Sequence, residues 1–138
     1  GPMPGLEEAL SALRRRGIPF GVVSSSWRWY VERCLRELDM YEDAAVIVTG
    51  SDGLPLKPAP APYQAAARVF RPAPPGAVLA VEDSGSGVRS AVAAGLACAA
   101  VYNPDSGAQD LSPARWRRSR AASTAAWWSS RAKAPGGG

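Results

Sequence analysis

The sequence predicts an α/β fold of three layers, in which helices cover both faces of a parallel, Rossmann-like sheet. Short apolar runs alternate with amphipathic segments from residue 6 to residue 101, and this alternation is typical of parallel α/β sheets. The clearest strand runs from Val78 to Val81 and is apolar throughout, which indicates burial on both faces. Two carboxylates, Glu82 and Asp83, follow it, and a glycine-containing segment then indicates the start of a helix.

The first elements are expected to be a helix and a strand. Leu6, Leu10 and Leu13 recur at helical spacing, and Gly17 after three arginines is typical of a helix end. The apolar segment 18–23 then predicts a strand that runs into three serines. The remaining elements are expected as a helix from about residue 27, a strand at 45–48, a loop at 49–56, a helix around 63–70, a turn at 72–76, a helix around 88–95, a strand at 97–101 and a loop at 102–107.

Polar groups suited to a phosphorylated ligand follow three of these segments. Ligands of open α/β sheets bind at the carboxyl ends of strands, where Glu82 and Asp83 would offer Mg²⁺ the oxygen ligands that it prefers. The hydroxyls of residues 24–26 precede a helix, and a helix start can hold a phosphate as well as be capped by a serine. Lys57 lies in a proline-rich segment that restricts its backbone, so its ammonium could neutralise a phosphoryl group or the carboxylates.

Taken together, these motifs resemble the haloacid dehalogenase (HAD) superfamily of phosphohydrolases, and most of all the subgroup of β-phosphoglucomutase and small phosphosugar phosphatases. The resemblance covers residues 2–103 and rests on the order of four weak motifs. These are Pro4-Gly5 before a helix, Val23-Ser24-Ser25-Ser26, Lys57-Pro58-Ala59-Pro60, and Glu82-Asp83-Ser84 with Gly87 and Ala93-Ala94-Gly95.

The resemblance implies roles for six residues and a cofactor. Ser24 would hydrogen-bond the transferring phosphoryl group of a small phosphorylated metabolite, and Lys57 would bridge that group and the nucleophile. Asp83 would ligate Mg²⁺, with Glu82 helping directly or through water. Ser25 and Ser26 would line the phosphate pocket. The reaction would be that of a phosphatase or a phosphosugar mutase, passing through an aspartyl-phosphate.

The chain departs from the family pattern in one decisive respect. The family's nucleophile belongs to an Asp-x-Asp motif on the first, central strand, and no Asp-x-Asp occurs in the 138 residues. The helical cap that follows this strand in the family is missing as well. We therefore expect an incomplete HAD core that lacks its first strand and cap, folds poorly alone and has no activity. Substrate identity is left open, since the cap usually sets it.

Charge divides the chain into two parts. Residues 1–110 carry ten basic and twelve acidic residues, a net charge of −2, whereas residues 111–138 carry six basic residues and no acid. We interpret 1–110 as the partial hydrolase core and 111–138 as a tail rich in Arg, Ala, Ser and Trp. This tail is expected to be disordered, or out of frame from about Ser112, because GC-rich DNA read in the wrong frame gives such residues.

Composition excludes several classes of protein. The chain has no histidine, which excludes Ser-His-Asp triads and histidine-based zinc sites formed by this chain alone. No apolar run is long enough to span a bilayer, and no signal peptide is visible. Cys34 and Cys98 form no Cys-x-x-Cys pattern and are expected to be buried free thiols, as in a cytoplasmic protein.

Three alternatives remain open at this stage. The segment from Gly85 to Ser90 nearly matches the Gly-x-Gly-x-x-Gly fingerprint of a Rossmann-type dinucleotide-binding module, with Asp105 as the ribose acid. The basic, tryptophan-containing tail could bind nucleic acid by phosphate contacts and stacking, although no nucleic acid partner is expected. The third alternative is a non-catalytic HAD-like protein that retains a phosphate pocket.

Overall fold

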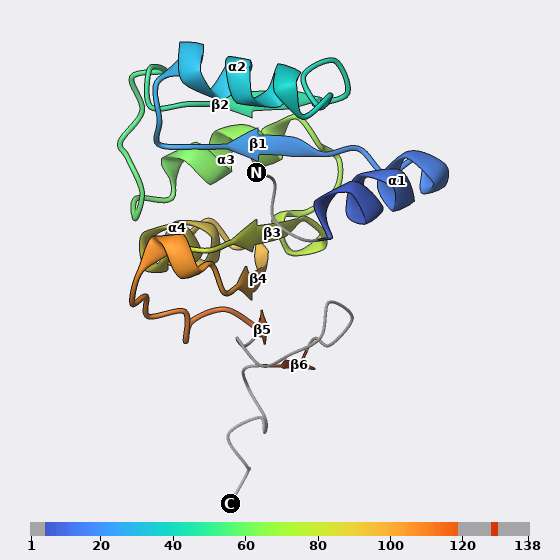
Figure 1. Cartoon of the computed structure of the whole chain (residues 1–138). Coiled ribbons are helices and arrows are strands. Elements are labelled where there is room, and N and C mark those ends of the chain that lie inside the picture. Colours follow the sequence, from blue (N-terminus) through green and yellow to red (C-terminus); the bar gives the residue numbers. More distant parts are fainter. Residues whose placement is uncertain (1–4, 119–127, 130–138) are drawn as a thin grey trace, which may run out of the picture.

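The computed structural model describes residues 5–118 and 128–129, and it has the alternating order of helices and strands that the sequence predicts (Figure 1). The helices are α1 (Leu6–Arg16), α2 (Arg28–Glu37), α3 (Ala61–Arg68) and α4 (Gly85–Ala93). The strands are β1 (Gly21–Val23), β2 (Val46–Val48), β3 (Leu79–Glu82), β4 (Ala97–Val101), β5 (Trp116–Arg118) and β6 (Trp128–Ser129). Two 3₁₀ turns, Pro75–Ala77 and Pro104–Ser106, lie in connecting loops.

Local sequence explains where the first helix ends. Gly17 adopts a left-handed conformation with φ of 62° and donates its amide to the carbonyl of Arg14. Glycine has no Cβ to oppose this conformation, so it ends α1 after a last turn whose arginines favour the negative end of the helix dipole. The predicted helix end is therefore confirmed.

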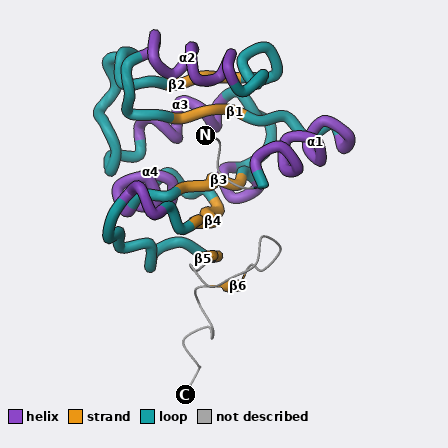
Figure 2. The backbone as a smooth tube through the Cα atoms, viewed as in Figure 1, coloured by secondary structure: helices purple, strands orange, loops and turns teal. Residues whose placement is uncertain are grey.

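The strands form two separate sheets among the described residues. β1 pairs with β2 in parallel, and β3, β4 and β5 pair in parallel with one another, while β6 adds to β5 in the antiparallel sense. Figure 2 shows β1 and β3 as neighbouring strands with no pairing between them, each at an edge of its own sheet. The resemblance to the HAD superfamily would place its first, central strand between these two strands, so the break agrees with the incomplete core that the sequence analysis expects.

Two apolar clusters hold the layers together. In the first, α1 and α2 pack on one face of β1 and β2, with Leu10, Val31, Leu35 and Met40 buried at its centre. In the second, α4 covers one face of β3 and β4, and α3 packs against α4 and against β1 and β2. Its buried members are Tyr63, Ala80, Val88, Ala91, Leu96, Cys98, Ala100 and Ala114. β1 and β2 therefore lie between two helical layers, as in the predicted three-layer fold, whereas the described helices cover only one face of β3.

The carboxylate strand differs from the prediction in one respect. We expected β3 to be buried on both faces, but Leu79 and Val81 are 55% and 58% exposed, while Ala80 and Glu82 are buried. Side chains alternate between the two faces of a strand, so only the face toward α3 and α4 is covered. The apolar run therefore contains one face that none of the described residues covers.

The segment after residue 110 also contains regular structure where none was expected. β5 pairs with β4 through Trp116 opposite Ala99, and Ala114 is fully buried beside it. The remainder of the predicted tail, at 119–127 and 130–138, lies outside the described residues, so its disorder or frame shift stays a prediction. No helix in the described part of the chain is long and apolar enough to span a membrane.

Candidate functional site

Lys57 connects the carboxyl ends of two strands that are not paired with each other. It follows the loop after β2, and its Nζ donates to the carbonyl oxygen of Val23 in β1 at 3.0 Å. The same Nζ lies 2.5 Å from Oε1 of Glu82, the last residue of β3. The two side chains are only 9% and 7% exposed, so this is a buried ion pair. Buried charges need close partners, and here each charge is the partner of the other.

Two further residues fix the Glu82 carboxylate. The hydroxyl of Tyr63, in α3, donates to Oε1 of Glu82 at 2.5 Å, and the Tyr63 ring lies 5.2 Å from Nζ of Lys57. Burial, and then the neighbouring Glu82, raise the pKa of Tyr63 far above its ordinary value, so the hydroxyl remains a donor. On the other side, a Cβ at Gly87 would overlap the Glu82 carboxylate. Only glycine at this position leaves room for the ion pair.

The three serines form a tight turn between β1 and α2, which we call the serine loop (residues 24–26). The amide of Ser24 donates to the carbonyl of Val48 at 2.9 Å, and the amide of Ser26 donates to Oγ of Ser24 at 3.2 Å. Ser25 is exposed, whereas Ser24 and Ser26 are half-buried. Because Lys57 bonds the carbonyl of the residue before Ser24, its ammonium and the serine loop lie together at the same edge of the sheet.

Asp83 is held by a loop from the other side of the site. Nδ2 of Asn103 donates to its Oδ2 at 2.8 Å, and Oγ of Ser106 donates to the same oxygen at 3.0 Å. Both hydrogen bonds end on Oδ2, which leaves Oδ1 to accept a cation as far as the described residues are concerned. Asp83 therefore fits a magnesium ligand, whereas Oε1 of Glu82 is already bonded by Lys57 and Tyr63. No cluster of three or more metal-binding side chains occurs among the described residues.

A cavity of about 210 Å³ adjoins Asp83 beneath this loop. It is lined by Asp83, Tyr102, Asn103, Gly107, Ala108, Gln109 and Leu111. The loop is closed onto the start of α4 by Gln109, whose Oε1 accepts the amide of Gly85 at 2.8 Å. The cavity thus belongs to the same site as the Asp83 carboxylate.

The start of α4 is capped by this chain's own side chains. Oγ of Ser84 accepts the amide of Gly87 at 3.1 Å, as expected for a helix N-cap, and Gln109 takes the amide of Gly85. A dinucleotide pyrophosphate would need these same amides at a helix start. In the segment that nearly matches Gly-x-Gly-x-x-Gly, the amides of both glycines are therefore already bonded to side chains of this chain. This disfavours the dinucleotide-binding alternative.

The structure brings together part of the predicted site. Lys57 and Glu82 meet directly, and Lys57 also bonds the residue before the serine loop, while Asp83 follows Glu82 but makes no hydrogen bond to the serines among the described residues. Sequence reasoning missed Tyr63, Asn103 and Ser106 as partners of the carboxylates. Tyr63 was expected only as a residue of an apolar helix face, and its hydroxyl is the signal that a buried polar partner must exist.

Comparison with known proteins shows which hydrolases the chain is similar to. A family model for haloacid dehalogenase-like hydrolases matches residues 1–95, which is more than half of the chain. YhcW of Bacillus subtilis (strain 168), provisionally named a phosphatase, is 36% identical over 104 residues, or 75% of this chain and 47% of YhcW. The validoxylamine A 7′-phosphate phosphatase of Streptomyces hygroscopicus subsp. limoneus is 31% identical over 81% of this chain and 56% of its own length. The chain thus spans about half the length of the curated relatives that it matches.

Solved structures show the same similarity. CbbY from Rhodobacter sphaeroides, in complex with phosphate, superposes with a TM-score of 0.75 at 29% identity and covers 83% of this chain and 51% of CbbY. A Thermotoga maritima protein provisionally named β-phosphoglucomutase gives a TM-score of 0.62 at 31% identity, over 73% of this chain and 47% of that one. Both similarities extend over most of this chain and about half of the other protein.

Proposed function

Because the chain belongs to the haloacid dehalogenase-like hydrolases, we propose that it supplies the phosphate-binding and metal-binding part of a phosphohydrolase site. The observation that carries this proposal is the buried pair of Lys57 and Glu82 beside the serine loop. A buried ammonium held at the carboxyl edge of a sheet, next to hydroxyls and backbone amides, offers a phosphoryl group charge and hydrogen bonds at one place.

Each predicted residue receives a role in this proposal. Ser24 donates a hydrogen bond to the phosphoryl oxygens, and Ser25 and Ser26 line the phosphate pocket. Lys57 contacts the phosphoryl group and is oriented by Glu82. Because Glu82 is only 7% exposed and holds Lys57 and Tyr63 through Oε1, we propose that this carboxylate acts on the metal only indirectly.

The proposed metal is Mg²⁺, bound through the free oxygen of Asp83. Asn103 and Ser106 hold the other oxygen, so the carboxylate is oriented before a cation arrives. When bound, Mg²⁺ would help to neutralise the negative charge of the phosphoryl group. Oε2 of Glu82 also lacks a hydrogen bond among the described residues, but that side chain is only 7% exposed. Further ligands would come from water, the substrate or residues beyond the described ones.

The proposed chemistry is phosphoryl transfer from a small phosphorylated metabolite through an aspartyl-phosphate. A carboxylate oxygen would bond to phosphorus as the ester oxygen leaves with a proton, and water would later hydrolyse the acyl phosphate. Phosphatase and phosphosugar mutase activities both fit this scheme. The sequence holds no Asp-x-Asp motif for the attacking aspartate, so we propose that the 138-residue chain binds phosphate without hydrolysing it, in a reducing compartment such as the cytoplasm.

Phosphate titration tests the binding proposal. Isothermal calorimetry of the 138-residue chain with inorganic phosphate, with and without Mg²⁺, should give binding that Lys57→Ala weakens by about tenfold or more, since a charge-assisted hydrogen bond is lost. Lys133→Ala removes the chain's other lysine and serves as the charge-matched control. Ser24→Ala provides a second test that leaves the buried ion pair in place.

The result can fail in two separable ways. Equal phosphate affinity in the wild type, Lys57→Ala and Ser24→Ala would place binding elsewhere and reject the assigned roles. Magnesium-dependent hydrolysis of a generic aryl phosphate by the pure chain would reject the proposed inactivity. A third result would favour a non-catalytic phosphate-binding protein. In that case the chain binds phosphate but does not hydrolyse the aryl phosphate, even when a strand that carries the Asp-x-Asp motif is added to it.

A further inference from the structure

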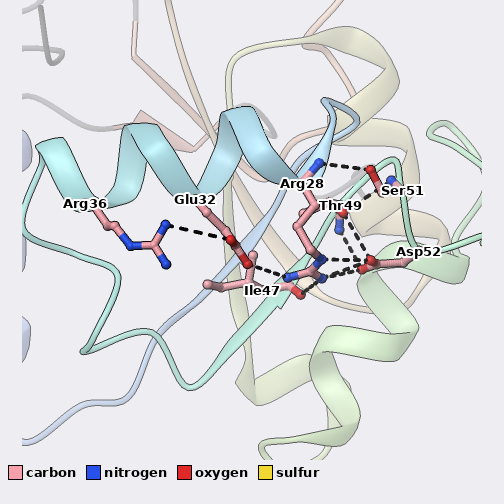
Figure 3. A network of polar contacts seen from close by, with 7 residues as sticks. All are labelled: Arg28, Glu32, Arg36, Ile47, Thr49, Ser51 and Asp52. Atoms are coloured by element: carbon pink, nitrogen blue, oxygen red, sulfur yellow. Dashed lines mark hydrogen bonds and ion pairs between the residues drawn. The ribbon is translucent and has the colours of Figure 1, made fainter.

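We infer that Arg28 and Asp52 are positioning residues that hold the serine loop at a fixed place beside Lys57. The two residues form what we call the Arg28–Asp52 bridge (Figure 3). Nη2 of Arg28 lies 2.9 Å and 3.0 Å from the two carboxylate oxygens of Asp52, and Nε lies 3.3 Å from one of them. This inference rests on the proposed phosphate function, because it assigns the bridge to that same site.

The bridge connects the two segments that carry the phosphate-binding groups. Arg28 is the first residue of α2, directly after the serine loop and Trp27. Asp52 lies in the loop between β2 and Lys57, five residues before the lysine. A contact between these two residues therefore sets where the serine loop lies relative to the chain that leads into Lys57.

Backbone contacts run alongside the bridge and show how closely the two segments approach. The amide of Gly50 donates to the carbonyl of Ser26 at 2.8 Å, and the amide of Arg28 donates to Oγ of Ser51 at 2.9 Å. A Cβ at Gly50 would overlap the carbonyl of Ser25, so the loop after β2 lies directly against the serine loop. The serine loop is thus held in place by its neighbour as well as by its own turn.

The Asp52 end of the bridge is itself fixed. Its Oδ2 accepts the amide of Thr49 at 2.9 Å, and its Oδ1 accepts the Thr49 hydroxyl at 3.1 Å. Burial alone would raise the pKa of Asp52, but the hydrogen bonds from Thr49 and Arg28 outweigh it and hold that pKa below its ordinary value. Asp52 is therefore kept ionised and oriented by Thr49 and Arg28 together.

The Arg28 end is fixed by three acceptor groups. Besides Asp52, the guanidinium donates to the carbonyl of Ile47 in β2 at 3.0 Å and to the carboxylate of Glu32 one turn along α2. The Arg28 side chain is 39% exposed, so solvent screens its charge and the directed hydrogen bonds matter more than the net attraction. A planar donor set of this kind favours arginine over lysine.

The test combines amide hydrogen exchange with phosphate titration on the 138-residue chain. Arg28→Ala and Asp52→Ala should each speed exchange of the Gly50 amide and weaken the binding of inorganic phosphate by about tenfold. The double variant should lose less phosphate affinity than the sum of the two single losses, because both substitutions remove one shared contact. Arg28→Lys keeps the charge but not the planar donors and should fall between Arg28→Ala and wild type, while Asp52→Asn covers the case in which Asp52→Ala does not fold.

Arg33→Ala is the matched control. Arg33 lies on the same helix and pairs with Glu37 at 3.1 Å, but this exposed pair touches neither loop. Control and test variants should melt within a few degrees of one another, and only the bridge variants should lose phosphate affinity and Gly50 protection. A general loosening of α2 would instead lower phosphate affinity in Arg33→Ala as well, and that result would overturn the inference.

The two proposals fail separately. Unchanged Gly50 exchange and unchanged phosphate affinity in the bridge variants would overturn the inference while leaving the phosphate site intact. A wild-type chain that binds no phosphate would reject the proposed function, and the Gly50 exchange rates would then still decide whether the bridge holds the serine loop.

Discussion

At the scale of single residues, the Lys57–Glu82 pair dominates the energetics of the site. Both side chains are more than nine-tenths buried, so removing Lys57 leaves the Glu82 carboxylate desolvated with Tyr63 as its one hydrogen-bond partner among the described residues. We expect Lys57→Met to lower the free energy of unfolding by about 3–5 kcal/mol. Urea denaturation measures this loss. The double variant Lys57→Met/Glu82→Gln, which leaves no unpaired charge, should recover part of it, and a double variant as unstable as Lys57→Met would contradict this explanation.

Cys98 should make the free energy of unfolding depend on pH in the alkaline range. Burial, followed by the charge of Glu82, raises the pKa of the thiol from 9.0 to about 11. The unfolded thiol loses its proton first, so the stabilisation is complete below pH 9 and is lost as the pH rises toward 11. A shift of this size corresponds to at most about 2–3 kcal/mol.

Chemical denaturation between pH 8 and about 11 tests this dependence. The unfolding free energy of the wild type should fall across the upper part of this range, and Cys98→Ala should fall less steeply. The buried hydroxyl of Tyr63 acts in the same direction at still higher pH, since its pKa is also raised, so Tyr63→Phe should remove a further part of the slope. Equal slopes in wild type and Cys98→Ala would contradict the assignment to Cys98.

At the scale of elements, α4 depends on its first turn. Ser84 caps this helix by accepting the amide of Gly87 at 3.1 Å, and the same helix start positions Glu82 and Asp83. Ser84→Ala should lower the free energy of unfolding by about 1 kcal/mol, the usual value of an N-cap. Ser11→Ala, at an exposed position inside α1, should instead be neutral or slightly stabilising, because alanine is the better helix former. Equal losses in both variants would contradict a capping role.

Most elements, and part of the site, could be predicted from sequence because their signals are local. The end of α1 at Gly17 and the strand at 97–101 follow from chain stereochemistry and apolar periodicity over a few residues. The contacts that orient the site could not be predicted. Tyr63 reaches Glu82 over 19 residues and Asn103 reaches Asp83 over 20, so only the folded chain brings each pair together.

Which face of β3 is covered could not be predicted from the sequence either, because this also depends on contacts with distant parts of the chain. Leu79 and Val81 have the apolar character of a fully buried strand, yet both are exposed in the described structure. Apolar character indicates which side chains favour burial, whereas burial itself also requires a neighbouring element to cover them. The break between β1 and β3, by contrast, agrees with the expected absence of the first, central strand, since no described segment pairs with both edges.

At the scale of the whole molecule, the two unpaired edges and the exposed face of β3 should govern solution behaviour. Strand edges present unpaired N–H and C=O groups, and apolar side chains beside them favour pairing with another chain. We therefore expect the 138-residue chain by itself to unfold in a broad transition and to self-associate as its concentration rises. Sedimentation velocity over a range of concentrations and a thermal melt measure the two properties.

A charge added to the exposed face of β3 should distinguish self-association by strand-edge pairing from nonspecific association. A lysine on an edge strand opposes pairing with a second strand, so Val81→Lys should keep the chain monomeric at concentrations where the wild type associates. Val69→Lys adds the same charge at a residue that is also half exposed, 50% against 58%, but that follows α3 and lies on no strand. If both variants suppressed association equally, net charge would be the cause. A sharp, concentration-independent melt of monomeric wild type would mean that the core is stable despite the break between its sheets.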